Sequence, residues 1–331
     1  MMAAALVVAM GGTPGAAATL QVYSGITIFG DSLSDPGNAA ALAAAAGRPF
    51  PPEFPLGKAS DGPLWSERVA AEFTTRGLPA RNFAFAAARV LPDDKDGLFP
   101  GINLPAQLRN FAAAAPAPLA PGHLALFWLG ANDLRAALRD FDPQGNLLSE
   151  VATLATSAIA AATSLVQQAT AVRAAGIHDI LFVTAPDLSL TPAALLRSNE
   201  ERALAQLATG IFNATLGAAV SALDLIEPDL RVSVFDINKG LIATLGNPDA
   251  FGVTNPLALS CLDAIGVPPP LDRLGECRAH FFYDDIHPSS TLHAALAADI
   301  RTVVAPIPLP AAGWLLLTGL VLLGGVARRR A

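Results

Sequence analysis

Short runs of apolar residues alternate along the chain with longer segments in which apolar residues recur every three to four positions. A short apolar run bounded by glycine, proline or polar residues is typical of a buried strand, and the three-to-four spacing is typical of an amphipathic helix. We therefore predict strands over residues 26–30, 81–85, 123–129, 179–183 and 231–235. Helices are predicted over residues 64–73, 102–115, 149–175, 195–226, 237–245 and 291–304.

Strands that alternate with helices predict βαβ units, and therefore a parallel sheet that helices cover on both faces. No internal repeat is visible, so the pattern predicts one doubly wound α/β domain with a sheet of about five strands. The alanine- and proline-rich segment 35–56 interrupts the alternation. We expect it to form an irregular insert on the side of the functional site.

The first predicted strand ends in Gly30-Asp31-Ser32, and this turn makes Ser32 a candidate nucleophile. Open parallel sheets bind ligands beyond the carboxyl ends of their strands, where this serine lies. The tripeptide is common by chance, so the assignment depends on partners elsewhere in the chain. A serine hydroxyl is a weak nucleophile near neutral pH and needs a base, which in turn needs an orienting group.

The segment 284–288, with the sequence DDIHP, supplies both partners. Two residues separate Asp284 from His287, which lets the carboxylate fold back onto one imidazole nitrogen and leaves the other nitrogen for Ser32. Asp285 is the weaker orienting candidate, because its side chain starts from a neighbouring position that points elsewhere. We expect Asp285 to cap the loop instead.

Attack of a serine on a carbonyl also requires N–H donors that stabilise the developing oxyanion. Asn132 follows a predicted strand and Gly130, in the same strand–glycine order as Ser32, and is a candidate side-chain donor. The backbone N–H groups of Ser32 and of the Ala86-Ala87 turn complete the expected oxyanion hole. The alternative role for Asn132 is that of a helix N-cap.

The composition restricts the class of partner. The chain has 331 residues, of which 52% are hydrophobic, so it can bury a large core. Its formal net charge is −7 and no basic face or basic run is visible, which argues against binding to nucleic acid. An uncharged or weakly anionic substrate is easier to accommodate.

Cys261 and Cys277 are the only cysteines, and in an exported chain such a pair predicts one disulfide. Two free buried thiols are the alternative, while a zinc pair lacks neighbouring ligands at metal spacing. Asp284, Asp285 and His287 as metal ligands would need a second cluster that the sequence does not contain, so we expect no metal and no other cofactor. The remaining histidines are expected at strand edges, in loops and on helix surfaces: His123, His178, His280 and His293.

Both ends of the chain have the features of targeting segments. Residues 1–18 are small and apolar and end in alanines, which fits a signal peptide without the usual basic start. Residues 307–312 lead into the apolar run 313–327 and the arginines 328–330, a pattern typical of a short membrane helix with a positive-inside stop. A buried C-terminal helix is the alternative. We expect a signal peptide over 1–18, one folded domain over 19–305 and a C-terminal sorting segment over 306–331.

The C-terminal pattern resembles the PEP-CTERM sorting tails of the VPLPA type. That resemblance implies export, at least transient attachment to a membrane, and processing by a protease of the exosortase type. The protein is then expected in the periplasm, at the cell surface or outside the cell.

The candidate site residues lie in segments that resemble blocks I, III and V of the SGNH/GDSL hydrolase family: 30–35 (GDSLSD), 130–133 (GAND) and 284–288 (DDIHP). Residues 82–88 (NFAFAAA) resemble block II, and 60–65 (SDGPLW) is similar to a motif of the lecithinase/phospholipase-like branch. The resemblance spans roughly residues 26–300. It implies a flavodoxin-like three-layer α/β/α fold, a Ser32-His287-Asp284 triad and cleavage of carboxylic esters without a metal.

The substrates that this resemblance implies are lipid esters, short soluble esters or O-acylated polysaccharides. Block II of the family normally presents glycine to the oxyanion, whereas this chain has Ala86 and Ala87. A Cβ restricts φ and crowds the hole, so we expect reduced activity or a preference for small acyl groups. The alternative function is that of a surface-attached binding or matrix protein that keeps the fold without turnover.

Overall fold

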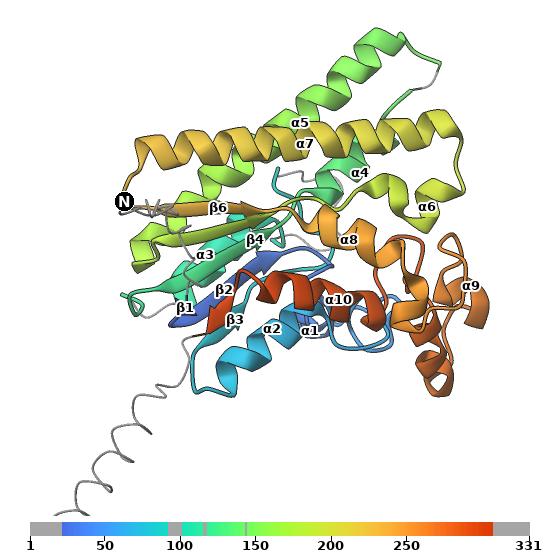
Figure 1. Ribbon diagram of the computed structural model, residues 1–331, viewed down its shortest axis with the longest axis horizontal. Coiled ribbons are helices and arrows are strands. Elements are labelled where there is room, and N and C mark those ends of the chain that lie inside the picture. The colour runs from blue at the N-terminus through green and yellow to red at the C-terminus, as the bar shows by residue number, and fades with distance from the viewer. Residues whose placement is uncertain (1–21, 92–100, 115–117, 143, 307–331) are drawn as a thin grey trace, which may run out of the picture.

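A five-stranded parallel sheet forms the centre of the computed structural model, which describes residues 22–91, 101–114, 118–142 and 144–306 (Figure 1). Its strand order is β3-β2-β4-β5-β6, and every neighbouring pair is parallel. The predicted parallel α/β fold is confirmed. The strands are β2 (Gly25–Gly30), β3 (Ala80–Asn82), β4 (His123–Trp128), β5 (Asp179–Val183) and β6 (Arg231–Phe235).

The order of the strands fixes where the site lies. β2 is the first strand of this sheet in the sequence, yet it lies between β3 and β4. This is the flavodoxin-like, doubly wound order, in which the direction of winding reverses beside the first strand. The reversal opens a crevice beyond the carboxyl ends of β2 and β4. The segments that follow Gly30 and Trp128 both begin there.

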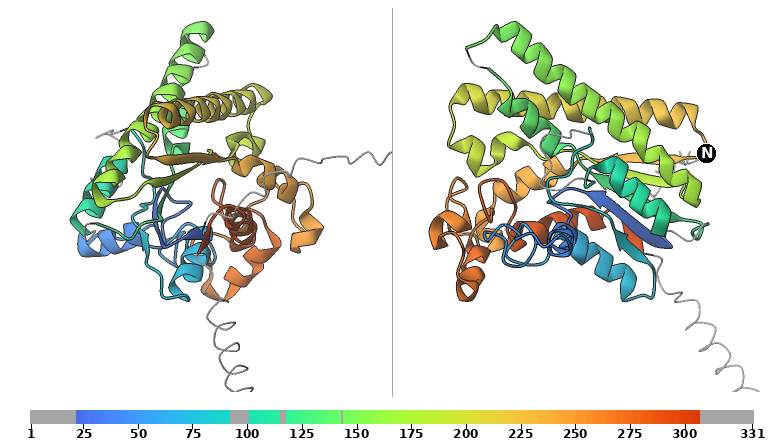
Figure 2. Two further views of the ribbon diagram at one scale, coloured as in Figure 1. Left: turned by 60° about the vertical axis from the view of Figure 1, so that its left-hand side comes forward. Right: turned by 180° about the vertical axis from the view of Figure 1, so that it is seen from behind.

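Helices cover both faces of the sheet, and strand residues alternate between the two faces (Figures 1 and 2). Phe29, Phe127 and Phe182 belong to the core on one face, and their rings stack across β2, β4 and β5. Ile28 and Leu126 belong to the core on the other face. The first face is covered by α3 (Leu104–Ala114), α5 (Leu147–Ala169) and α7 (Asn199–Ile226), the second by α2 (Trp65–Thr74), α8 (Ile237–Leu245) and α10 (Ser290–Arg301).

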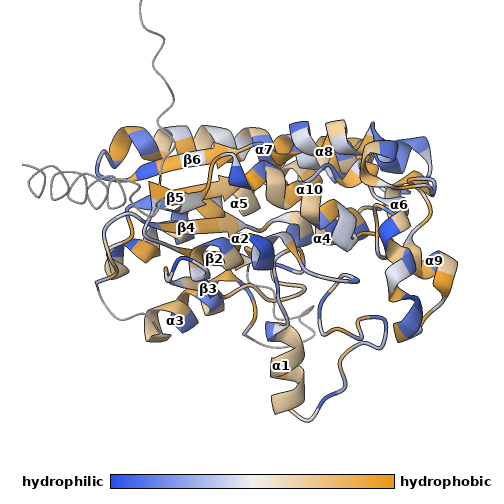
Figure 3. Cartoon of the chain, turned by 60° about the horizontal axis from the view of Figure 1, so that its bottom comes forward, coloured by the Kyte–Doolittle hydropathy of each residue, from blue (hydrophilic) through white to orange (hydrophobic). Residues whose placement is uncertain are grey.

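A small second sheet joins the two ends of the described chain. β1 (Val22–Tyr23) pairs in parallel with β7 (Ala305–Pro306). Hydrophobic residues are concentrated in the strands of the main sheet (Figure 3). The remaining elements are short: α1 (Asn38–Ala45), α4 (Ala131–Arg139), η1 (Thr170–Ala175), η2 (Leu188–Leu190), α6 (Pro192–Leu195), η3 (Pro248–Phe251), α9 (Cys261–Ile265) and η4 (Leu271–Ala279), where η marks a 3-10 helix.

The segment 35–56 is not wholly irregular, contrary to the prediction, because it contains α1. The carboxylate of Asp35 accepts the N–H groups of Gly37, Asn38 and Ala39 at 2.8, 2.5 and 3.1 Å. These are donors that a helix start leaves without partners inside the helix. The alanine-rich sequence that follows has a high helix propensity, so α1 forms although it has no clear apolar stripe.

Two other predicted elements differ in extent. The predicted strand 81–85 is assigned only as far as Asn82, whose side-chain oxygen accepts the N–H of Ala84, although the N–H groups of Phe83 and Phe85 still donate to carbonyls of β2. The predicted helix 195–226 is divided into α6 and α7. The division lies at Ser198, which forms a capping box with Glu201 and starts the longer helix.

Two helical stretches in the described residues are long and apolar enough to cross a membrane by length and composition, namely 147–175 and 199–226. Both contribute side chains to the core on one face of the sheet, as covering helices of a doubly wound fold do. The predicted signal peptide over 1–18 lies outside the described residues. The predicted sorting segment 306–331 also lies outside them, apart from Pro306.

Candidate functional site

Ser32 lies directly beyond β2, in a turn that hydrogen bonds hold from two sides. Asp31 Oδ1 accepts the N–H of Leu33 at 3.0 Å. Gln107 of α3 forms two hydrogen bonds with the backbone of Gly30 at the end of β2. Its Nε2 donates to the carbonyl of Gly30 at 2.7 Å, and its Oε1 accepts the Gly30 N–H at 3.1 Å. Sequence reasoning missed Gln107, since a glutamine in an amphipathic helix carries no sign that it is buried.

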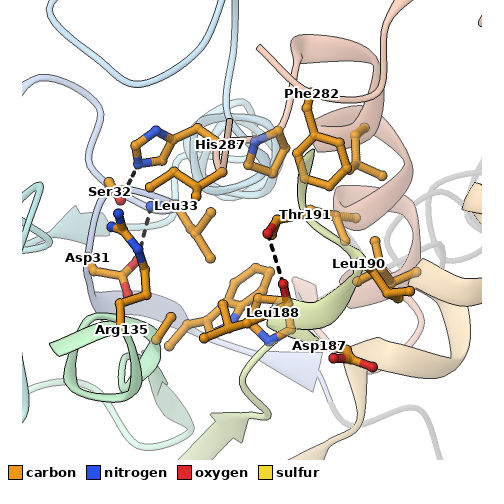
Figure 4. Close-up of a pocket in the computed structure, with 18 of the residues that line it drawn as sticks. Asp31, Ser32, Leu33, Arg135, Asp187, Leu188, Leu190, Thr191, Phe282 and His287 are labelled. Carbon is orange, nitrogen blue, oxygen red and sulfur yellow. Dashed lines mark hydrogen bonds between the residues drawn. The ribbon is translucent and has the colours of Figure 1, made fainter. Parts of the chain in front are cut away.

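His287 reaches Ser32 from a loop 255 positions further along the chain. Its Nε2 lies 2.9 Å from Ser32 Oγ, and its Nδ1 lies 2.6 Å from Asp284 Oδ2 (the first contact is drawn in Figure 4). Asp284 Oδ1 accepts the N–H groups of Ile286 and His287 at 2.9 and 2.6 Å. Burial acts to raise the pKa of Asp284, but His287 and these donors outweigh burial, so the pKa is lowered. The structure therefore brings Ser32, His287 and Asp284 into one hydrogen-bonded chain.

A disulfide-linked segment supports the loop that carries His287. Cys261 and Cys277 form the predicted disulfide. The N–H of Cys261 donates to the carbonyl of Phe282 at 3.0 Å, and the N–H of Tyr283 donates to the carbonyl of His287 at 2.8 Å. The first bond ties the loop to the disulfide segment and the second closes the loop on itself. The disulfide segment thus helps to hold the loop that carries the imidazole.

Asp285 does not orient the imidazole, because Asp284 already occupies His287 Nδ1. The side chain of Asp285 is exposed, and its backbone carbonyl accepts the N–H of Ala193 at 2.8 Å. That bond links the loop to α6. Phe54 packs edge-on against the imidazole with ring centroids 5.7 Å apart.

Of the three backbone N–H groups expected in the oxyanion hole, two are available and one is not. Within the described parts of the chain, the N–H groups of Ser32 and Ala87 donate to no other residue. The N–H of Ala86 donates instead to Asp35 Oδ2 at 2.8 Å, contrary to the expectation. Because this N–H already donates to a carboxylate, Ala86 is not free to bind an oxyanion. Ala87 has a φ of 66°, a left-handed conformation that favours glycine.

Asn132 lies in the first turn of α4 and lines the same pocket as Ser32. Its Nδ2 donates one proton to the carbonyl of Ala88 at 3.0 Å, and an amide carries two such protons. The N-cap of α4 is Gly130 and not Asn132, so the alternative role of Asn132 as a cap is wrong. The neighbouring Asp133 was not singled out from the sequence, yet it holds the same loop by accepting backbone N–H groups from residues 90 and 91.

Gly130 allows α4 to start close to the sheet. Its φ is +122°, and a Cβ there would lie 2.3 Å from Cζ of Phe212 in α7. No other residue type satisfies both the backbone conformation and the close approach. This glycine therefore sets the position from which Asn132 extends.

A narrow pocket of about 50 Å³ opens beside Ser32 and His287 (Figure 4). Most of its lining is apolar, and Leu33, Leu188 and Phe282 are among the side chains that form it. Arg135 of α4 is the basic residue in the lining besides His287. The arrangement can remove a proton from the Ser32 hydroxyl and can hold a small apolar group next to it.

The other histidines lie outside this arrangement. His293 was expected on a helix surface, but it is fully buried and accepts the backbone N–H of Trp65. Burial lowers its pKa to about 3, which keeps it neutral. His123 is buried beside Thr27, and burial lowers its pKa to about 4. Among the residues that the structure describes, no group of three or more His, Cys, Asp or Glu side chains is placed to hold a metal ion.

Comparison with known proteins identifies relatives that share most of the chain. Residues 26–300 match the family described as GDSL-like Lipase/Acylhydrolase. A phosphatidylcholine-sterol acyltransferase of Aeromonas hydrophila is 25% identical over 333 residues, which cover 87% of this chain and 92% of that protein. An acetylesterase of Thermothelomyces thermophilus is 25% identical over 281 residues, covering 81% of this chain and 84% of that protein.

Solved structures with a similar course of the chain include an extracellular lipase from Streptomyces rimosus, with a TM-score of 0.46, 12% identity and coverage of 84% of this chain and 99% of the lipase. A carbohydrate acetylesterase family member from Sinorhizobium meliloti has a TM-score of 0.40 and 15% identity. The match covers 84% of this chain and 98% of that protein.

The carboxyl of Asp31 makes stability depend on pH. Burial raises its pKa to about 7 from an ordinary value of 3.8, and its Oδ2 has no hydrogen-bond partner among the described residues. The folded protein therefore holds a proton that the unfolded chain releases, so the contribution of Asp31 to the free energy of unfolding falls as pH rises from about 4 to about 7.

Asp31→Asn keeps the Oδ1 acceptor and removes this titration. We expect the variant to gain about 2–4 kcal/mol in the free energy of unfolding relative to the wild type between pH 4 and pH 7.5. Urea unfolding of both proteins at the two pH values measures the gain. The same difference at both pH values would show that Asp31 titrates normally.

Proposed function

The chain belongs to the GDSL-like lipase/acylhydrolase family and is an ester hydrolase, and on this premise we propose that it cleaves carboxylic esters with Ser32 as the nucleophile. His287 acts as the general base and Asp284 orients it. The observation that carries the proposal is the unbroken chain of hydrogen bonds from Asp284 through His287 to Ser32, at 2.6 and 2.9 Å.

In the proposed reaction, His287 Nε2 takes the Ser32 proton while Oγ attacks the ester carbonyl. Asp284 accepts a hydrogen bond from the N–H at Nδ1, which selects the tautomer with a free Nε2 and stabilises the imidazolium that forms. The imidazolium then protonates the leaving alcohol, and an acyl group remains on Ser32. His287 next activates a water molecule that releases the acid and restores the serine.

The proposed oxyanion hole consists of three N–H donors. Two are the backbone N–H groups of Ser32 and Ala87, which have no other acceptor in the described residues. The third is the second Nδ2 proton of Asn132, whose first proton is fixed by Ala88. Ala86 is left out because its proton belongs to Asp35. Donors that are held before the substrate arrives stabilise the developing charge without reorganisation.

The proposed substrates carry a small acyl group. The pocket beside Ser32 is apolar and only about 50 Å³ in volume, and the methyl group of Ala87 stands where the family has glycine. Both features favour acyl chains of a few carbons, whether the ester is a lipid, a soluble compound or an O-acylated polysaccharide. One relative of this chain is named an acetylesterase, which agrees with a short acyl group. The intact hydrogen-bonded chain at Ser32 favours turnover over a purely binding role.

We also propose that the protein is exported and sorted through its C-terminal segment. The disulfide between Cys261 and Cys277 supports export, because disulfides persist in oxidising compartments. The sequence of residues 307–330 supports attachment to a membrane and removal by an exosortase-type protease.

Ser32→Ala is expected to lower kcat for a short-chain p-nitrophenyl ester by about 10⁴-fold or more, because it removes the nucleophile.

Asp284→Asn is expected to lower kcat by about 10⁴-fold, because the amide favours the wrong imidazole tautomer. Asp285→Asn is the matched control and is expected to keep most of the activity. Steady-state kinetics measures kcat for the three variants, and circular dichroism shows whether each of them is folded. Retained turnover in folded Ser32→Ala protein would rule out this nucleophile, and equal losses in the two aspartate variants would remove the role of Asp284.

Ala87→Gly is expected to widen the oxyanion hole and to relieve the left-handed backbone of Ala87. The ratio of kcat/KM for an eight-carbon over a two-carbon acyl ester is expected to rise by about 10-fold. Ala86→Gly is the control, because the N–H at that position faces Asp35. An acyl-chain-length series on the three proteins measures the ratio, and an unchanged series in Ala87→Gly would refute crowding.

Mass spectrometry of the protein recovered from its producing cells checks the export proposal. The mature chain is expected to start near residue 19, to lack the residues after about 306 and to resist alkylation at Cys261 and Cys277. A chain that still carries Met1 and two alkylated cysteines would contradict export.

A further inference from the structure

A wide groove of about 1070 Å³ adjoins the narrow pocket. It lies among α4, the start of α5, α6 and the start of α7, and its lining includes Leu138, Leu147, Leu204 and Leu207. Leu147 and Leu207 are 64% and 42% exposed, so the groove offers apolar surface to a bound molecule. The groove is thus large enough for the bulk of a substrate whose reacting end lies at Ser32.

Arg135 stands where the pocket and the groove meet, since it lines both of them. It follows Asn132 by three residues on α4, a spacing that places both side chains on the same face of the helix. Figure 4 shows the Arg135 side chain beside Ser32 and Asp31. A group bound to Arg135 therefore lies within a few bonds of an ester carbonyl at Ser32.

The guanidinium of Arg135 makes no hydrogen bond or ion pair with any residue in the described ranges. Burial lowers its pKa, which reflects a cation partly removed from water. A half-buried cation without a partner has lost part of its hydration, and an anion that enters the site would compensate for that loss. Arginine is also suited to such an anion, because its planar fork matches carboxylate and phosphate oxygens.

Three carboxylates act on Arg135 electrostatically without contacting it: Asp285, Asp284 and Asp31. Asp284 is already satisfied by His287 and two backbone donors. Asp31 is buried with a raised pKa, which lowers its average charge near neutral pH. The side chain of Asp285 is exposed and forms no hydrogen bond or ion pair with Arg135 within the described ranges. These groups therefore leave the guanidinium open to an incoming anion.

We propose that Arg135 determines specificity by binding an anionic group of the substrate, so that the protein prefers esters that carry a phosphate or carboxylate close to the scissile bond. The acyl group occupies the narrow pocket, the anionic group contacts Arg135, and the remaining apolar part of the substrate lies in the groove. The inference rests on the proposed esterase function.

Two pairs of esters separate charge from shape. One pair is a short-chain 1-acylglycerol and its 3-phosphate, and the other is 4-acetoxybutanamide and 4-acetoxybutanoate, which carry the amide or the carboxylate on the alcohol side of one acetyl ester. The wild type is expected to hydrolyse the charged member of at least one pair with a kcat/KM about 10-fold above the neutral member, and the preferred pair tells phosphate from carboxylate. Arg135→Gln is expected to abolish this preference mainly through KM, and Arg135→Lys to restore part of it, because lysine keeps the charge without the fork.

Arg109→Gln is the matched control, because it removes the same charge from an exposed side chain of α3 that lines neither the pocket nor the groove. It is expected to keep the wild-type preference. Equal hydrolysis of charged and neutral members by the wild type, or an equal loss for both members in Arg135→Gln, would overturn the proposal while leaving the esterase function intact.

Binding measurements keep the test independent of turnover. Isothermal titration of the charged esters into Ser32→Ala protein is expected to show a Kd at least about 10-fold lower than in the Ser32→Ala, Arg135→Gln double variant. Equal Kd values in the two proteins would also overturn the proposal. Absence of hydrolysis of every ester by the wild type, with this difference in Kd present, would reject the esterase function and keep Arg135 as an anion-binding residue.

Discussion

The reversal of winding beside β2 is the constraint on which the site depends. It places the carboxyl ends of β2 and β4 next to each other at one edge of the sheet, so Ser32 and Asn132 project from neighbouring strands. The stacked rings of Phe29 and Phe127, with centroids 4.6 Å apart, pack across this pair of strands. The loop with His287 has no strand to carry it. It is fixed at the same edge by the disulfide segment instead.

Buried carboxylates organise the loops around this edge, where regular secondary structure is absent. Asp35 accepts N–H groups from the start of α1 and from Ala86, and so joins two loops that are distant in the sequence. Asp133 accepts two N–H groups from the loop that follows Ala87. Bonds from a backbone N–H to a charged oxygen are about twice as strong as bonds between neutral groups. They give irregular backbone the rigidity that oriented donors need.

Local patterns in the sequence predicted the fold and the hydrogen bonds that link Asp284, His287 and Ser32. Buried strands are apolar whatever lies next to them, an Asp three residues before the base can reach it within one turn, and two cysteines in an exported chain leave one pairing. Features that depend on distant residues were not predictable. Gln107 and His293 are polar side chains whose burial depends on their tertiary partners, Gly30 and Trp65. The N–H of Ala86 is lost to Asp35, 51 positions away, and no spacing in the sequence reveals that bond.

The pairing of β1 with β7 brings the two ends of the described domain together. β1 precedes β2, so this small sheet stands at the amino edge of the main sheet, whereas Ser32 follows the carboxyl end of β2. The two edges are separated by the six residues of β2, about 20 Å of extended chain. The first and last elements of the described domain therefore lie at the edge of the sheet opposite the serine.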